Sequence, residues 1–125
     1  MTMPPLPQAP EFLSWSDVDR LIDYLLPQLR GPYDALLMIT RGGIIPGGLI
    51  AEALDIRQIL TAAVEFPQAG QGRFVWPNFL QFPDEALVRD RRVLIVDDIW
   101  AHGRTMTTVK GRILAAGGRP ETAVL

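Results

Sequence analysis

With 125 residues, of which 48% are hydrophobic, the chain has the size of one globular domain that buries roughly two thirds of its unfolded surface. Its formal net charge of -2 argues against a nucleic-acid partner and against an anionic membrane surface, and a small-molecule partner fits better. The absence of cysteine excludes disulfides and thiolate metal sites and is compatible with a reducing cytoplasm, where we expect the protein to act.

Residues 1–14 are predicted to form a flexible arm ahead of one core domain at 15–125. The first ten residues, MTMPPLPQAP, hold four prolines, no basic residue and no apolar stretch of the kind found in export signals. No apolar run in the chain approaches the ~18 residues that a membrane span needs. We therefore expect neither export nor membrane insertion.

The core domain is predicted to begin with a helix and a strand. Apolar residues recur at helical spacing from 18 to 26, behind Ser14 and Ser16, either of which could cap the first turn. This helix should end near Pro27. The run DALLMIT, residues 34–40, is short, apolar and bounded by glycines, as expected of a strand covered on both faces.

A second helix is predicted over 44–54, IIPGGLIAEAL. Pro46 suits a first helical position, and one apolar stripe should face the core. That stripe consists of Leu49, Ile50, Ala53 and Leu54. A second strand, IRQILTAAV, is predicted to follow at 56–64.

The remaining elements complete an alternating pattern. RVLIVDD, residues 92–98, is the clearest strand, apolar positions from 106 to 116 mark a helix that Gly117 and Gly118 stop, and TAVL at 122–125 begins another strand. This alternation predicts an α/β fold, a single domain with a mainly parallel β-sheet flanked by helices. In such sheets, ligands bind beyond the carboxyl ends of the strands.

A long segment at about 65–90 interrupts this alternation with glycines, three prolines and a cluster of aromatic residues. Connections of this length are usually functional lids or disordered inserts, and we predict a long loop here. Its aromatic residues are interpreted as packing or subunit-interface residues, with a base-stacking platform as the alternative. This interpretation concerns Trp76, Phe79 and Phe82, and Phe74 belongs to the same aromatic cluster.

Two carboxylates stand where the clearest strand should end. Asp97 and Asp98 are followed by AHGRT, which leads into a helix starting at about Arg104. The free N–H groups at a helix N-terminus can hold a phosphate, with Gly103 permitting close approach and Thr105 adding a hydroxyl. The carboxylates would repel that phosphate unless they bind hydroxyls or a metal. A phosphorylated ribose with a Mg²⁺-bound anion beyond it fits every part.

Simpler interpretations exist for each feature alone. The acidic pair could be an ordinary solvated strand exit, TRGG at 40–43 could be a simple turn, and the whole chain could be a doubly wound scaffold without a phosphate site. Arg89, Arg91 and Arg92 are interpreted as a solvated strand entry, with phosphate steering as the alternative.

Three segments resemble the type I phosphoribosyltransferase family. VLIVDDIWAHGRTM is similar to the family's phosphoribosyl-pyrophosphate signature, two acidic residues followed by a small loop ending G-x-T. MITRGGIIPGGLIAEALDIR resembles the pyrophosphate loop and following helix of bacterial xanthine-guanine phosphoribosyltransferases, and WSDVDRLIDYLLPQL resembles their opening helix. The likeness extends over roughly residues 15–125.

The resemblance implies a role for individual residues. Asp97 and Asp98 would contact the ribose 2- and 3-hydroxyls and serve as the protein's metal ligands. The 5-phosphate would be held by the loop Ala101, His102, Gly103, Arg104 and Thr105. Pyrophosphate would be held by Thr40, Arg41, Gly42 and Gly43, in this family often through a non-proline cis peptide. The segment at 65–90 matches the place of the family's mobile catalytic loop, in which Arg73 would be the best-placed cation.

The reaction that the resemblance implies is displacement of pyrophosphate from ribose C1 by a nitrogen base, a purine in the most similar enzymes. Mg²⁺, bound mainly through phosphoribosyl pyrophosphate, and Arg41 would offset charge on the leaving group, and no covalent nucleophile is needed. The implied partners are these small molecules and further copies of the chain in a homodimer or homotetramer.

Two departures from the family pattern motivate an alternative. Ala101 stands where a carboxylate usually assists the base, a contribution of about 10²- to 10⁴-fold in rate, although uracil phosphoribosyltransferases are similar in having alanine there. His102 replaces a threonine and would make phosphate affinity pH dependent. The family's base-gripping hood segment is also absent before Leu125. The alternative is a non-catalytic protein that binds phosphoribosyl pyrophosphate or a nucleotide.

Overall fold

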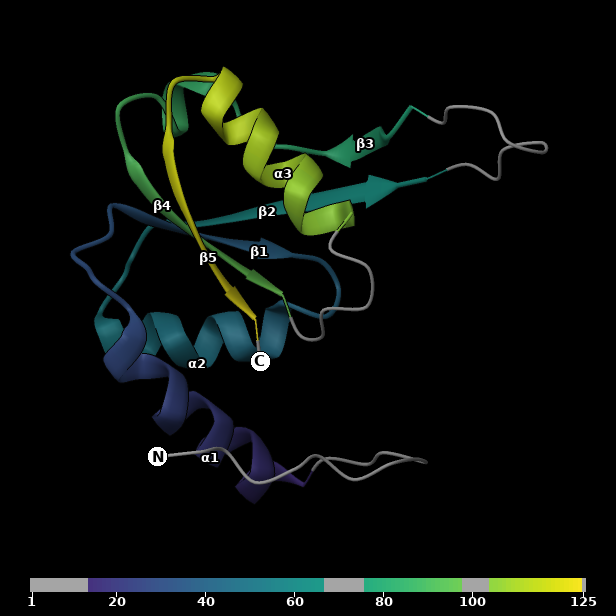
Figure 1. Ribbon diagram of the computed structural model, residues 1–125. Helices are drawn as coiled ribbons and strands as arrows, with labels where there is room; N and C mark the ends of the chain where they lie inside the picture. The colour runs from purple at the N-terminus through teal and green to yellow at the C-terminus, as the bar shows by residue number, and fades with distance from the viewer. Residues whose placement is uncertain (1–13, 67–75, 98–103, 125) are drawn as a thin grey trace.

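The computed structural model describes residues 14–66, 76–97 and 104–124 (Figure 1). The elements, in chain order, are α1 (Trp15–Leu25), the 3-10 helix η1 (Leu26–Gln28), β1 (Ala35–Ile39), α2 (Ile44–Leu54), β2 (Ile59–Glu65), β3 (Asn78–Gln81), the 3-10 helix η2 (Glu85–Leu87), β4 (Arg92–Asp97), α3 (Arg104–Ala115) and β5 (Arg119–Val124). Within these ranges, no helix is long and apolar enough to cross a membrane.

Five strands form one sheet in the order β3-β2-β1-β4-β5, and β3 is its antiparallel member. Figure 1 shows α1 and α2 below this sheet and α3 above it. The predicted α/β fold with a mainly parallel sheet flanked by helices is therefore confirmed. β1 lies at the centre, with Met38 opposite Val96 of β4 and Ile39 opposite Ala62 of β2.

Each central strand contributes to two cores, one on each face of the sheet. Leu36 and Leu94 pack with α1 and α2, whereas Leu37 and Ile95 pack with α3. All four side chains are fully buried. This two-sided burial explains why the runs at 34–40 and 92–98 are continuously apolar and do not alternate with polar residues.

The first helix starts with the predicted cap. Ser14 accepts a hydrogen bond from the Asp17 N–H at 3.2 Å, and the Asp17 carboxylate accepts one from the Ser14 N–H at 2.9 Å. The Ser14 N–H, and then the Ser14 hydroxyl, donate hydrogen bonds to the Asp17 carboxylate, and both bonds lower the pKa of that carboxyl. The α-helix ends at Leu25, and Pro27 lies in the 3-10 turn that follows, near the predicted end.

The predicted apolar stripe of the second helix is wrong in part. Leu49 and Ala53 are exposed, and the buried residues are Pro46, Gly47, Ile50 and Ala51. Pro46 is the third helical residue rather than the first, because α2 begins at Ile44. The physical reason is close packing: a Cβ built at Gly47 would lie 2.8 Å from the Met38 Cγ, so α2 faces β1 with its small residues.

The predicted long loop at 65–90 is also partly wrong. β2 continues to Glu65, β3 pairs antiparallel with it, and η2 follows, so residues 67–75 alone of this segment lie outside the described structure. The four-residue β3 lies at the sheet edge between Pro77 and Pro83, where a short strand can pair on one side.

Two of the aromatic residues of this segment serve packing, as predicted. The Phe79 and Phe82 rings meet edge to face with centroids 5.4 Å apart and pack against the core under α3. Trp76 is 77% exposed, and Phe74 lies outside the described ranges. The predicted strand at 122–125 begins earlier, at Arg119, since β5 pairs with the whole length of β4.

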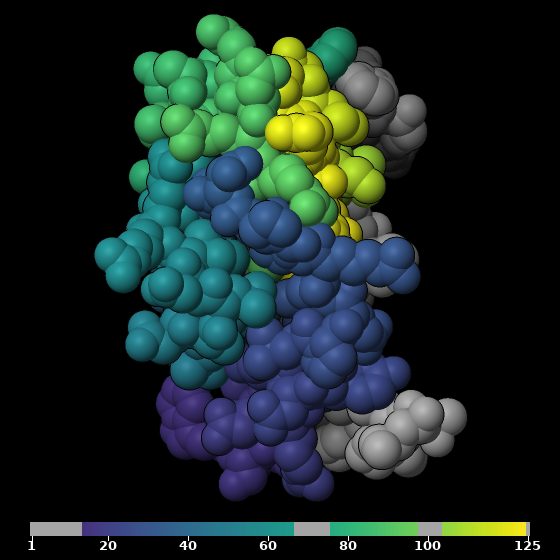
Figure 2. Space-filling view, turned by 90° about the vertical axis from the view of Figure 1, so that its left-hand side faces the viewer, coloured from purple at the N-terminus to yellow at the C-terminus, as the bar shows by residue number. Residues whose placement is uncertain are grey.

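The parallel strands begin at the end of the molecule seen in Figure 2, where the chain between α1 and β1 runs across the surface. Tyr33 donates a hydrogen bond to Glu121 at 2.7 Å, and the Arg92 guanidinium lies 3.6 Å from Glu121 and over the Tyr33 ring.

The other two arginines of the predicted strand entry also have partners at this end. Arg91 donates a hydrogen bond to Gln58, and Arg89 forms an ion pair with Glu85. Arg92 begins the strand that Asp97 ends, so the interpretation of these arginines as a strand entry holds over phosphate steering.

Candidate phosphoribosyl pyrophosphate site

The sheet has a switch point between its central strands β1 and β4. The chain leaves β1 for α2 on one face of the sheet, and after β4 it continues in α3 on the other face. The helices that follow β1 and β4 therefore lie on opposite faces of the sheet, and ligands of open α/β sheets bind outside the carboxyl ends of the strands at such a point. Both sequence motifs that were predicted to bind the ligand follow these strand ends.

The turn after β1 is held by backbone hydrogen bonds. The Thr40 N–H donates to the Ala62 carbonyl at 2.9 Å, and the Gly43 N–H donates to the Ile39 carbonyl at 2.8 Å. The Thr40–Arg41 peptide is cis, as the family resemblance implied for this loop. Arg41 is exposed, so its guanidinium is accessible at the carboxyl end of β1.

Gly43 joins this turn to the end of β4. A Cβ built at Gly43 would overlap the Val96 carbonyl oxygen and would lie 2.9 Å from the Ile39 N and O atoms. Val96 directly precedes Asp97, the last residue of β4. The missing side chain of Gly43 thus allows the predicted pyrophosphate turn to pack directly against the strand that carries the predicted ribose ligand.

The first turn of α3 forms the third part of the site. Asp97 is half-buried at the end of β4, and α3 starts at Arg104 among the described residues, with Thr105 half-buried beside it. The Arg104 guanidinium carbon lies 4.1 Å from the centroid of the ring of Phe66, the residue that directly follows β2. Phe66 was not among the predicted site residues, because a single aromatic residue at a strand end has no distinguishing pattern.

Five predicted site residues lie outside the described ranges, so their roles stay predictions. They are Arg73, Asp98, Ala101, His102 and Gly103. The structure brings the turn Thr40, Arg41, Gly42 and Gly43 next to the strand that ends in Asp97. Arg104 and Thr105 follow in the first turn of α3.

The described side chains suit a metal ion that takes most of its ligands from other groups, such as substrate phosphates. Within residues 14–66, 76–97 and 104–124, no group of three or more His, Cys, Asp or Glu side chains could enclose a metal. Asp97 is the carboxylate at the described part of the site. Mg²⁺ commonly binds through one or two carboxylates together with substrate phosphates, so this donor set fits it.

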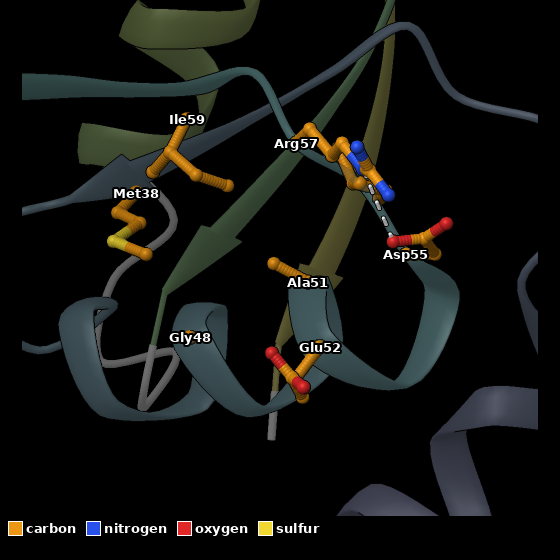
Figure 3. Close-up of a pocket in the computed structure, with 8 residues that line it drawn as sticks. Met38, Gly48, Ala51, Glu52, Asp55, Arg57 and Ile59 are labelled. Atoms are coloured by element: carbon orange, nitrogen blue, oxygen red, sulfur yellow. Dashed lines mark ion pairs between the residues drawn. The ribbon is translucent and has the colours of Figure 1, made fainter.

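A separate hollow of about 420 Å³ lies between α2 and the start of β2, and none of its lining residues is a predicted site residue. In Figure 3, Met38 and Ile59 lie on its strand side, and the Asp55–Arg57 ion pair, with a separation of 3.6 Å, lies at the end of α2. Apart from Met38, its lining residues belong to α2, to the segment after α2 and to the start of β2. We therefore place the candidate site at the strand ends, where the geometry fits the two motifs.

Comparison with known proteins decides the family. The model of the phosphoribosyl transferase domain matches residues 12–124. The chain belongs to the phosphoribosyl transferase family. Its predicted resemblance is thus confirmed.

Two curated relatives in this phosphoribosyl transferase family are xanthine-guanine phosphoribosyltransferases. That of Ruegeria sp. (strain TM1040) is 32% identical over 109 residues, which are 78% of this chain and 61% of the relative. That of Roseobacter denitrificans is 31% identical over 110 residues, 80% of this chain and 62% of the relative. The chain therefore spans about three fifths of the length of these curated relatives.

Solved structures share the phosphoribosyl transferase fold. The purine phosphoribosyltransferase from Pyrococcus horikoshii is 30% identical, with a TM-score of 0.75 over 90% of this chain and 74% of that one. The xanthine-guanine-hypoxanthine phosphoribosyltransferase of Helicobacter pylori has a TM-score of 0.71 at 17% identity, over 90% of this chain and 74% of that one, which shows likeness of fold alone.

Proposed function

We propose that this chain transfers the ribose 5-phosphate of phosphoribosyl pyrophosphate to a purine base and releases pyrophosphate. The observation that carries the proposal is the packing of the turn at Gly43 against the Val96 carbonyl, directly before Asp97. This packing puts a turn suited to pyrophosphate beside a carboxylate suited to ribose hydroxyls. The purine class is supported by the names of the xanthine-guanine and purine enzymes that the chain resembles.

In the proposed reaction, the bond from ribose C1 to the pyrophosphate oxygen breaks and a bond from C1 to a base nitrogen forms. The base nitrogen loses its proton to solvent or to a buffer base. The exposed Arg41 would offset negative charge on the departing pyrophosphate, and Asp97 would hold the ribose through its hydroxyls. Thr105 and the backbone N–H groups at the start of α3 would hold the 5-phosphate.

We propose Mg²⁺ as the cofactor, held by Asp97 and Asp98 and mainly by the substrate's phosphate oxygens. When bound, it supplies positive charge that offsets the charge of the pyrophosphate group. Asp97, at the end of β4, would orient the ribose through its hydroxyls.

Pyrophosphate release tests this function. The full chain is incubated with phosphoribosyl pyrophosphate, Mg²⁺ and guanine, xanthine, hypoxanthine, adenine or uracil, and pyrophosphate and nucleotide are both measured. We expect nucleotide and pyrophosphate in equal amounts with at least one purine. Folded protein that yields neither with any base would refute the transfer reaction.

The same experiment separates transfer from the binding-only alternative. Ala101 removes the family's usual carboxylate, but the relatives reported above carry the names of transferases, so they do not favour a protein that only binds. Thermal stabilisation by phosphoribosyl pyrophosphate without turnover would be the result that favours it.

We also propose that the chain assembles into a homodimer or homotetramer in the cytoplasm. Three apolar side chains of α2 remain exposed, namely Ile44, Ile45 and Leu49. An exposed apolar surface of this kind is typical of an interface. Light scattering should report a multiple of 13.9 kDa that Ile45→Glu reduces. Leu114→Glu, at an equally exposed position on α3, is the control and should leave the mass unchanged.

A further inference from the structure

Two residues from different elements meet beside the candidate phosphate site. Phe66 directly follows β2, and Arg104 is the first described residue of α3. The Arg104 guanidinium carbon lies 4.1 Å from the Phe66 ring centroid, within the range of a cation–π contact. This contact joins the end of β2 to the helix turn that, under the proposed function, receives the 5-phosphate.

The charge on Arg104 is unfavourable for the helix itself. A cation near a helix N-terminus faces the positive end of the helix dipole, and α3 has no acidic residue in its first turn. Across residues 14–66, 76–97 and 104–124, no carboxylate forms an ion pair with Arg104. Among the described residues, the Phe66 ring is therefore the group that stabilises the Arg104 cation. Under the proposed function, the negatively charged phosphate binds next to this cation.

We propose that Phe66 and Arg104 form a positioning pair for phosphoribosyl pyrophosphate, an inference that rests on the proposed function. The ring holds the guanidinium, and through it the first turn of α3, against the end of β2. The backbone N–H groups and the Thr105 hydroxyl are then ordered before the phosphate arrives. The pair keeps a positive charge next to the phosphate position, and no carboxylate of the described residues pairs with that charge.

The pair should act on binding rather than on bond breaking. The 5-phosphate does not react, and we expect its contacts to be equally strong in the bound substrate and in the transition state, which is uniform binding. Losing such contacts raises KM while kcat stays nearly constant. We therefore expect Phe66→Leu, which keeps apolar volume but removes the aromatic face, to raise KM for phosphoribosyl pyrophosphate about three- to tenfold. Its kcat should stay within about twofold.

The same helix offers a matched control. Arg112 lies over the rings of Phe79 and Phe82, at 4.6 and 5.0 Å from their centroids. This contact has the same chemistry but lies about 12 Å further along α3, since each residue advances the helix by about 1.5 Å. Phe79→Leu should lower the unfolding temperature and leave KM for phosphoribosyl pyrophosphate unchanged.

Rescue and coupling identify the interaction itself. Phe66→Tyr keeps the ring face and should keep the wild-type KM. Arg104→Gln, at an exposed position that tolerates the change, should raise KM, and adding Phe66→Leu to it should raise KM little further, because each variant removes the same contact. Arg104→Gln also keeps the test decisive if Phe66→Leu folds poorly.

The outcomes separate this inference from the function on which it rests. If wild-type protein neither turns over nor is thermally stabilised by phosphoribosyl pyrophosphate, both proposals fail. If wild-type protein binds and Phe66→Leu and Arg104→Gln both keep its KM, the positioning pair alone is refuted. Equal and fully additive KM effects of the two changes would also refute it, since independent residues would then be acting.

Discussion

The α-carbon of Gly43 faces the Val96 carbonyl oxygen so closely that a side chain at position 43 would overlap it. The turn after β1 and the end of β4 therefore hold each other in place at the switch point of the sheet. This contact ties the two predicted ligand-binding motifs together.

Gly43→Ala should impair both folding and activity. Its Cβ would overlap backbone atoms, which cannot move aside as a flexible side chain can, so we expect a loss of roughly 1–3 kcal/mol in unfolding free energy. Displacement of the turn should lower kcat/KM by about 10²-fold even where the protein is folded. Urea unfolding and initial rates check this, and an alanine variant with wild-type kinetics would contradict the role given to the contact.

Gly47 and Gly48 form a contrasting pair on α2. A Cβ at Gly47 would lie 2.8 Å from the Met38 Cγ and 3.3 Å from the Leu36 Cδ2, whereas a Cβ at Gly48 would have no neighbour within 4 Å. We expect Gly48→Ala to raise the unfolding free energy by about 0.5–1 kcal/mol through helix propensity. Gly47→Ala should lower it, because overpacking outweighs that gain. Urea unfolding of both variants measures the difference, and an equal gain in both would disprove close packing of α2 on β1.

Asp97→Asn keeps the shape of the side chain but removes its charge. Hydrogen bonds to a charged group contribute about 1.5–3 kcal/mol, so kcat/KM for phosphoribosyl pyrophosphate should fall about 10- to 100-fold. Asp55→Asn is the control, since Asp55 is exposed, forms a surface ion pair with Arg57 and has a φ of 52°, which asparagine tolerates. Kinetics that respond equally to both changes would argue against a ligand role for Asp97.

The central strands and the two motifs were predictable because their physical causes are local. Strands buried on both faces need continuous apolar residues, and a carboxylate pair followed by G-x-T is rare enough to indicate a family. The contact between Gly43 and the Val96 carbonyl left no trace in the sequence, since it depends on two segments that fold together. The buried face of α2 was mispredicted for the same reason: Gly47 packs closely because β1 lies beneath it.

Edge features were harder to predict. β3 has four residues between two prolines, too few to show an alternating pattern, and its pairing with β2 arises from the sheet around it. The contact of Phe66 with Arg104 joins residues that are far apart in the sequence, so neither residue alone indicated it. Tertiary packing decides such features, and local propensity does not.

Tyr33 should make the stability of the fold depend on alkaline pH. Burial, and then the hydrogen bond that its hydroxyl donates to Glu121 at 2.7 Å, raise the pKa of Tyr33 from 10.0 to about 12. A raised pKa in the folded state means that the contribution is complete below pH 10.0 and is lost as the pH rises towards about 12. The unfolding free energy of the wild type should therefore fall over this interval, and that of Tyr33→Phe should fall less.

Titration of the phenol provides an independent check. In a Tyr24→Phe background, Tyr33 is the one remaining tyrosine, so the absorbance of its phenolate can be followed directly in the folded protein. At neutral pH, Tyr33→Phe should cost about 0.5–1.5 kcal/mol for the lost hydrogen bond to Glu121. A folded-state midpoint at pH 10.0, or identical pH profiles for wild type and Tyr33→Phe, would show that the bond to Glu121 does not hold the phenol proton.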